Sequence, residues 1–123
     1  MHKKALIVED EAETRGLLAM LLQEGGCDVH AVVDGAQAIE RLAADDYGVI
    51  VLDIVLPRVS GTEVMEYLAR TKPDALANVI VVTGLNVEEI RRLFPAVGHA
   101  LSKPVVPRRL MQSVAMCLSA THG

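Results

Sequence analysis

Aromatic residues are nearly absent from this chain of 123 residues, which contains two Tyr, one Phe and no Trp. They make up 2% of the sequence, whereas hydrophobic residues together make up 51%. The core must therefore consist mainly of aliphatic side chains, as is typical of parallel strands buried under helices. The length suits one ordinary hydrophobic core, so we expect a single domain over residues 1–123.

Cysteine is scarce, and long hydrophobic segments are absent. Cys27 and Cys117 lie far apart, and neither has a CxxC partner or a histidine at metal-site spacing. This argues against a disulfide framework and against a zinc centre. Apolar runs such as Val49–Leu52 are far too short to span a bilayer, and no signal-peptide region follows residues 1–4. We therefore expect a cytoplasmic protein without membrane insertion, with both cysteines reduced in the core.

An excess of positive charge is missing as well. Twelve Lys and Arg stand against sixteen Asp and Glu, which gives a formal net charge of -4. A field of this sign repels the phosphate backbone of nucleic acids. Direct nucleic-acid binding is therefore not expected.

The chain does contain a regular alternation of short apolar runs with helical patterns. This alternation predicts five βα units, a parallel sheet and an α/β fold. The expected strands cover residues 5–8, 28–32, 49–52, 79–82 and 100–102. Nothing beyond Ala120 resembles a linker or an effector segment, so we expect no output domain.

The helices are expected between and after these strands. The first should bury one apolar stripe of leucines and stop at Gly25-Gly26; the stripe consists of Leu17, Leu18, Leu21 and Leu22. The others are expected over residues 35–44, from about 62 to 72, from about 87 to 94, and from about 107 onward.

Polar residues follow the apolar runs where a ligand site would form. In open parallel sheets, ligands bind at the carboxyl ends of the strands. Glu9 and Asp10 follow the first expected strand and Asp53 follows the third. If these strands are neighbours, three carboxylates share one crevice and repel one another unless a cation lies between them. A site made only of oxygen ligands favours Mg²⁺.

Two further residues complete a possible phosphoryl site. Thr83 follows the fourth expected strand and Lys103 the fifth. A hydroxyl and an ammonium are suited to hold phosphoryl oxygens. Asp53 could then act as a nucleophile and form an acyl phosphate.

In this combination the sequence resembles the receiver domain of bacterial response regulators, which belong to two-component signalling systems. The resemblance covers essentially the whole chain and rests on motifs in the order and spacing of that family. These are Val8-Glu9-Asp10-Glu11, Leu52-Asp53-Ile54-Val55-Leu56-Pro57 through Gly61, Thr83-Gly84 and Lys103-Pro104.

The resemblance implies a doubly wound, flavodoxin-like three-layer fold with strand order 2-1-3-4-5. It implies that Asp53 is the phosphoacceptor and that Thr83 and Lys103 hold the phosphoryl oxygens. Asp10, Asp53 and the main-chain carbonyl of Val55 would bind Mg²⁺, with Glu9 acting largely through water. It also implies a cis bond between Lys103 and Pro104.

The partners implied by the resemblance are a sensor histidine kinase or a histidine phosphotransfer domain, and an unknown downstream protein. Such a domain is not a metabolic enzyme; it catalyses its own phosphorylation and dephosphorylation. Two alternatives stay open. One is a receiver fold that binds partners without phosphorylation, and the other is an aspartate-based phosphatase of the haloacid dehalogenase type. The phosphatase usually carries a second Asp where this chain has Val55.

The sequence departs from the receiver pattern at several positions. Ala100 stands where receivers commonly carry Tyr or Phe, so the aromatic part of their usual switch is missing. His99 should point to the opposite face of its strand and so cannot replace that ring. Val55 and Leu85 cannot orient a hydrolytic water by hydrogen bonding, which predicts slow dephosphorylation.

Overall fold

The computed structural model describes residues 3–55 and 59–120. It consists of five βα units, as the alternation of apolar runs predicts. The strands are β1 (Lys4–Val8), β2 (Asp28–Val32), β3 (Val49–Leu52), β4 (Val79–Thr83) and β5 (His99–Ser102). The helices are α1 (Ala12–Glu24), α2 (Gly35–Ala44), α3 (Gly61–Thr71), α4 (Val87–Leu93) and α5 (Pro107–Ala120).

The strands form one parallel sheet in the order β2-β1-β3-β4-β5. The doubly wound, flavodoxin-like order 2-1-3-4-5 is therefore confirmed. Val8 pairs with Leu52, so β1 and β3 end side by side. The residues that follow these two strands consequently meet at the carboxyl edge of the sheet.

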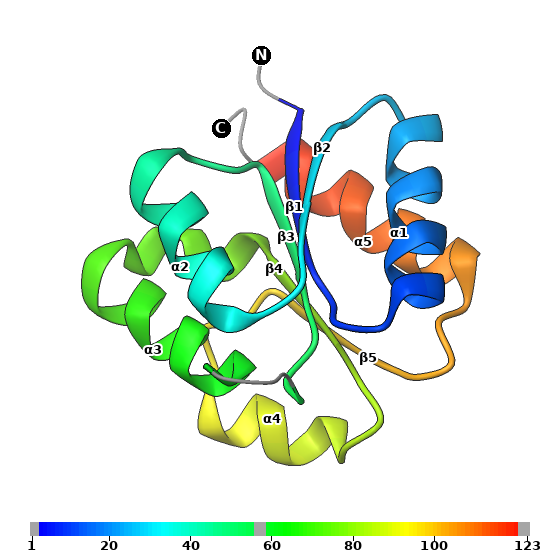
Figure 1. Ribbon diagram of the computed structural model, residues 1–123. Helices are drawn as coiled ribbons and strands as arrows, with labels where there is room; N and C mark the ends of the chain where they lie inside the picture. The colour runs from blue at the N-terminus through cyan, green and yellow to red at the C-terminus, as the bar shows by residue number, and fades with distance from the viewer. Residues whose placement is uncertain (1–2, 56–58, 121–123) are drawn as a thin grey trace.

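The sheet is the middle of three layers, and each face has its own aliphatic core (Figure 1). Helices α1 and α5 cover one face, and α2, α3 and α4 cover the other. Because side chains alternate along a strand, Ile7 of β1 packs under α1 and α5 while Leu6 packs under the opposite helices. Cys27 and Cys117 are buried free cysteines of the α1–α5 core, as expected.

One prediction for α1 is wrong. The four leucines do not form one buried stripe: Leu18 and Leu22 are buried, but Leu17 is 41% exposed. Residues 18 and 22 lie on the line of the helix that faces the sheet, and residue 17 lies about 100° around the axis from residue 18. Leu21 is partly buried beside the core.

A short 3₁₀ helix, η1 (Pro73–Asn78), was not predicted from the sequence. Pro73 occupies its first turn, where a missing N–H costs no hydrogen bond. Leu76 at its centre is buried in the core under α2, α3 and α4. The element therefore closes the end of the sheet opposite the carboxyl edge.

The Lys103–Pro104 peptide bond is cis, as the family resemblance implies. Within residues 3–55 and 59–120, no helix has the length and apolar character needed to cross a membrane. The Leu56-Pro57 part of the motif after Asp53 lies outside the described residues.

Candidate functional site

Two acidic residues of the candidate site lie in the turn between β1 and α1. The main-chain N–H of Glu9 donates to the carbonyl oxygen of Val32 at 3.1 Å, which continues the pairing of β1 with β2. The Glu9 side chain is buried, whereas Asp10 is exposed. The turn therefore presents one carboxylate at the base of the site and one at its rim.

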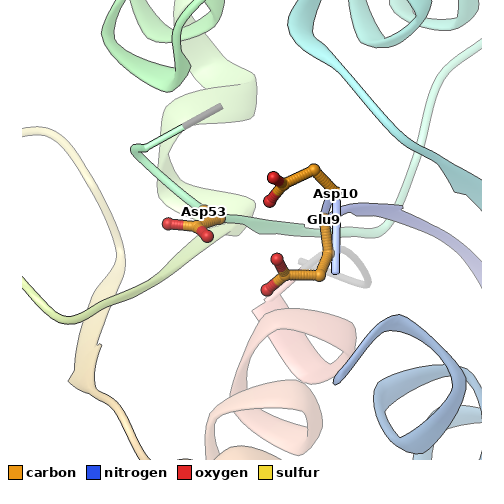
Figure 2. A group of neighbouring side chains, drawn as sticks. All are labelled: Glu9, Asp10 and Asp53. Carbon is orange, nitrogen blue, oxygen red and sulfur yellow. The ribbon is translucent and has the colours of Figure 1, made fainter. Parts of the chain in front are cut away.

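Asp53 comes from the neighbouring strand end. Its N–H donates to the carbonyl oxygen of Val8 at 3.1 Å, so β3 delivers it beside the acidic turn. Its side chain is nearly buried, and its Oδ1 accepts a hydrogen bond from the N–H of Val55 at 3.1 Å. Figure 2 shows the carboxylates of Glu9 and Asp10 turned toward the side on which Asp53 lies. One carboxylate oxygen from each of these three residues lies within 4.8 Å of the others.

Lys103 supplies the positive charge of this cluster. Its Nζ donates to Asp53 Oδ2 at 2.9 Å and to Glu9 Oε1 at 3.0 Å. The position of Lys103 follows from the pairing of β5 with β4, which continues as the Lys103 N–H donates to the carbonyl oxygen of Thr83 at 2.9 Å. The ammonium of Lys103 therefore bridges Asp53, the candidate nucleophile, and Glu9.

Burial and charge act against each other at this bridge. Burial raises the pKa of the Glu9 carboxyl, and hydrogen bonds from Lys103 and from the N–H of Glu11 offset only part of this rise. Burial lowers the pKa of Lys103, but the hydrogen bonds to Asp53 and Glu9 outweigh it and leave that pKa above its ordinary value. Lys103 is therefore a cation at neutral pH.

Thr83 ends β4 beside Gly84 but does not itself line the pocket among the described residues. Its side chain is fully buried, and its Oγ1 accepts a hydrogen bond from the N–H of Leu85 at 3.1 Å. Thr83 is the last residue of β4, so it lies at the strand end where the sequence predicts it. A role in holding phosphoryl oxygens stays a prediction.

The space above the carboxylates is an open pocket of about 360 Å³. Its walls combine charged groups with two apolar side chains, Val55 and Leu85, which are 59% and 50% exposed. The lining residues are Glu9, Asp10, Glu11, Asp53, Val55, Gly84, Leu85 and Lys103. An anionic group that enters here meets Lys103, while the apolar side chains offer no group to position water.

The donor set fits a hard divalent cation. The three carboxylates offer oxygen atoms only, and their spacing allows them to surround one ion. Mg²⁺ favours such ligands, keeps several waters and accepts phosphate oxygens. The ion would also offset the repulsion between acids of which two are buried.

One polar residue beside the site was missed by sequence reasoning. Nη1 of Arg15 donates to the main-chain oxygens of Glu9 and Asp10 at 3.1 and 3.3 Å. A basic side chain that begins one turn inside a helix can reach back over the preceding loop. This spacing was the available signal, but surface helices carry many arginines that make no such contact.

The departure at Ala100 is visible in the structure. Ala100 is buried in the core under α2, α3 and α4, beside Val81 of β4. His99 pairs with Ile80, which belongs to the opposite core. This register agrees with the expectation that His99 does not replace the missing ring.

Comparison with known proteins identifies relatives along nearly the whole chain. A family model for the response regulator receiver domain matches residues 5–115. The transcriptional regulatory protein TcrA of Mycobacterium tuberculosis is 34% identical over 101 residues, which is 82% of this chain and 40% of TcrA. The alkaline phosphatase synthesis regulator PhoP of Bacillus subtilis is 31% identical over 120 residues, which is 96% of this chain and 49% of PhoP. The chain thus spans less than half the length of these two regulators.

Solved structures agree with this assignment. The response regulator TrrA of Thermotoga maritima, crystallised with Mg²⁺ and BeF, is 28% identical with a TM-score of 0.84, covering 96% of this chain and all of that one. The receiver domain of a signal transduction histidine kinase from Syntrophus aciditrophicus is 27% identical with a TM-score of 0.82, covering 95% of this chain and 90% of that one. In strand order, motif order and sequence, this chain belongs to the receiver domain family of response regulators in two-component systems.

Proposed function

We propose that the chain accepts a phosphoryl group on Asp53 from a phosphohistidine of a sensor kinase or of a phosphotransfer domain. The observation that carries this proposal is the position of the Asp53 carboxylate. It is nearly buried, borders an open pocket, and contacts Lys103 beside two further acids. A carboxylate held in this way is a nucleophile with its charge partners already in place.

The transfer is a displacement at phosphorus. A carboxylate oxygen of Asp53 forms the new P–O bond while the P–N bond to the donor imidazole breaks. The imidazole nitrogen leaves with the electron pair and takes up a proton. Hydrolysis of the acyl phosphate returns Asp53 and inorganic phosphate. The protein therefore catalyses its own modification but turns over no metabolite.

The acids beside Asp53 are the candidates for holding Mg²⁺. We assign this role to Glu9, Asp10, Asp53 and the main-chain carbonyl of Val55, with Glu9 acting largely through water. When bound, the ion offsets the negative charge of the carboxylates and of the incoming phosphoryl group. Glu9 and Asp10 orient their oxygens toward this space because both follow β1 in one turn.

The remaining residues act on the phosphoryl oxygens. Lys103 exchanges its contact with Asp53 for a contact with a phosphoryl oxygen and so keeps an ionic partner. The Thr83 hydroxyl leaves the N–H of Leu85 and donates to another phosphoryl oxygen. This movement of the loop after β4 transmits the modification to α4 and changes the surface that a downstream protein contacts.

The first experiment is an intact-mass measurement after incubation with Mg²⁺ and acetyl phosphate. We expect the mass of one phosphoryl group to be gained, and to be absent in the Asp53→Asn variant and after chelation of Mg²⁺. A folded protein that gains no mass, and that also ignores phosphohistidine donors, contradicts the proposal.

Such a result would favour the alternative of a receiver fold that binds its partner without phosphorylation. The buried Thr83 hydroxyl and Ala100 at the usual aromatic position are the features compatible with that alternative. The haloacid dehalogenase alternative is abandoned because the chain belongs to the receiver family.

A further inference from the structure

The guanidinium of Arg15 lies against the turn that carries Glu9 and Asp10. Its Nη1 donates to the main-chain oxygen of Glu9 at 3.1 Å and to that of Asp10 at 3.3 Å. Arg15 itself is half-buried within α1. One side chain thus ties the first part of the helix back onto two consecutive peptide units of the acidic turn.

The start of α1 differs from the starts of the next three helices. Helices α2, α3 and α4 each begin with a residue whose side chain accepts a hydrogen bond from the N–H groups of the first turn; these residues are Asp34, Ser60 and Asn86. Glu11, in the same position before α1, makes no such bond. The turn before α1 is therefore not fixed by a side-chain cap.

Glu9 and Asp10 also differ in how firmly they are held. Glu9 is buried, and its carboxylate accepts from Lys103 and from the N–H of Glu11. Asp10 is exposed, and within the described part of the chain its one hydrogen bond is the one that its main-chain oxygen accepts from Arg15. The main-chain position of Asp10, from which its carboxylate extends, therefore depends more on Arg15 than the position of Glu9 does.

The positive charge of Arg15, taken alone, would weaken the binding of a divalent cation in the pocket. A cation near three carboxylates repels a divalent cation that approaches the same pocket. If Arg15 acted only through its charge, removing it would strengthen Mg²⁺ binding. If it acts by holding the peptide units in place, removing it weakens Mg²⁺ binding. The two roles therefore predict changes of opposite sign in the affinity for Mg²⁺.

We propose that Arg15 is a positioning residue for the acidic pocket and that its contacts to the Glu9 and Asp10 carbonyls set the affinity for a divalent cation. The inference rests on the proposed function, because it concerns the same Mg²⁺ site. Residues that orient metal ligands commonly affect affinity about tenfold or more when replaced. The long side chain suits this task because it brings one guanidinium nitrogen, with two N–H groups, within reach of both carbonyl oxygens.

The test is a titration of the ¹⁵N-labelled protein with MgCl₂, followed through the amide signals of Asp10 and Val55. Arg15→Lys keeps the charge, but its nitrogen lies one atom closer to the main chain and does not reach both carbonyl oxygens; Arg15→Gln removes the charge. The matched controls are Arg92→Lys and Arg92→Gln, because Arg92 is an exposed residue in the last turn of α4. All variants are titrated well below their unfolding temperatures, which thermal unfolding establishes beforehand.

We expect Arg15→Lys to raise the Kd for Mg²⁺ about tenfold. Arg15→Gln should raise it less, about threefold, because the lost repulsion offsets part of the effect. Both Arg92 variants should stay close to the wild type. An unchanged Kd in Arg15→Lys together with a lower Kd in Arg15→Gln would overturn the positioning role. A wild-type protein that shows no saturable shift would instead contradict the cation site of the proposed function itself.

Discussion

The ammonium of Lys103 lies between two carboxylates, 2.9 Å from Asp53 Oδ2 and 3.0 Å from Glu9 Oε1. Both acids are almost fully buried, whereas the Lys103 side chain keeps 29% of its surface exposed. Without a divalent cation, this lysine is the counter-charge that the two buried acids share. It therefore both stabilises the site and competes with a metal ion for the same oxygens.

Replacing Lys103 separates these two effects. Lys103→Met should lower the free energy of unfolding by about 2 kcal/mol in the absence of Mg²⁺, because two buried carboxylates lose their partner. This value is below the usual cost of a broken buried pair because Lys103 is partly exposed. The same variant should bind Mg²⁺ about fivefold more tightly, since a unit charge at about 4 Å contributes roughly 1 kcal/mol even in water.

Urea unfolding without and with Mg²⁺ measures both quantities, because a ligand of the native state raises stability according to its affinity. Lys103→Arg retains the charge and serves as the control. Tighter Mg²⁺ binding in Lys103→Arg, or weaker binding in Lys103→Met, would contradict the competition between lysine and metal ion.

Gly84, which lines the pocket, and Gly61, which lies against the main chain of Asp53, should respond to alanine in opposite directions. A Cβ added at Gly84 meets no atom within 4 Å. Gly84→Ala should therefore raise the free energy of unfolding by about 0.4–1 kcal/mol, because alanine lowers the conformational entropy of the unfolded chain. A Cβ at Gly61 would lie 2.4 Å from the main-chain oxygen of Asp53, where α3 starts against the strand end. Gly61→Ala should therefore destabilise by more than 1 kcal/mol. Equal effects of the two substitutions in urea unfolding would contradict this packing.

The architecture could be predicted because each strand is a short apolar run whose position depends on local sequence. Once the order of the strands is given, Glu9, Asp10 and Asp53 must meet, since each comes directly after β1 or β3. A contact that depends on the path of one long side chain, such as that of Arg15 with the acidic turn, has no comparable pattern in the sequence.

The prediction that failed concerns the face of a helix. The helical spacing of four leucines predicted that all of them lie on the buried side of α1, but the angle at which the helix meets the sheet leaves Leu17 exposed. The orientation of the Thr83 hydroxyl is a separate matter that the sequence left open, and its Oγ1 accepts a hydrogen bond from the main-chain N–H of Leu85 in the loop after β4. Hydrophobic patterning carries no information about either.

Both cysteine thiols should be unreactive in the folded protein. Burial raises the pKa of Cys117 to about 11 and also raises the pKa of Cys27, although Lys3 lowers the latter slightly. At pH 8 the thiolate of Cys117 is about a hundredfold rarer than that of an ordinary thiol, because each pH unit below the pKa reduces it tenfold. Its labelling rate should keep rising with pH up to about 11 rather than level off near 9.

Alkylation followed by mass spectrometry tests this directly. Two labels are expected in denaturant, and almost none in the native protein at pH 8. Rapid labelling of Cys117 under native conditions would show that α5 opens far more often than its buried packing implies.

The response of the surface formed by α4, β5 and α5 should be muted. In place of an aromatic ring that can move inward, the chain has the buried methyl group of Ala100. With Mg²⁺ and a beryllofluoride mimic of the phosphoryl group, large amide shifts are expected around the pocket and smaller ones on that surface. Shifts on that surface as large as those of a receiver with an aromatic residue at this position would contradict the prediction.

The lifetime of the acyl phosphate depends on whether a water can be held in line with the P–O bond. Val55 and Leu85 border the pocket with exposed apolar side chains and cannot hydrogen-bond to that water. Val55→Asn supplies a carboxamide at the same place, and one hydrogen bond of about 1 kcal/mol in the transition state corresponds to about fivefold faster hydrolysis. Phosphorylated protein freed of acetyl phosphate, sampled by intact mass over time, gives the rate. Val55→Ala is the matched control, because it opens the same space without offering a hydrogen bond. Equal acceleration in both variants would mean that Val55 shields the phosphoryl group by its bulk, and an unchanged lifetime in Val55→Asn would show that water at this position does not limit hydrolysis.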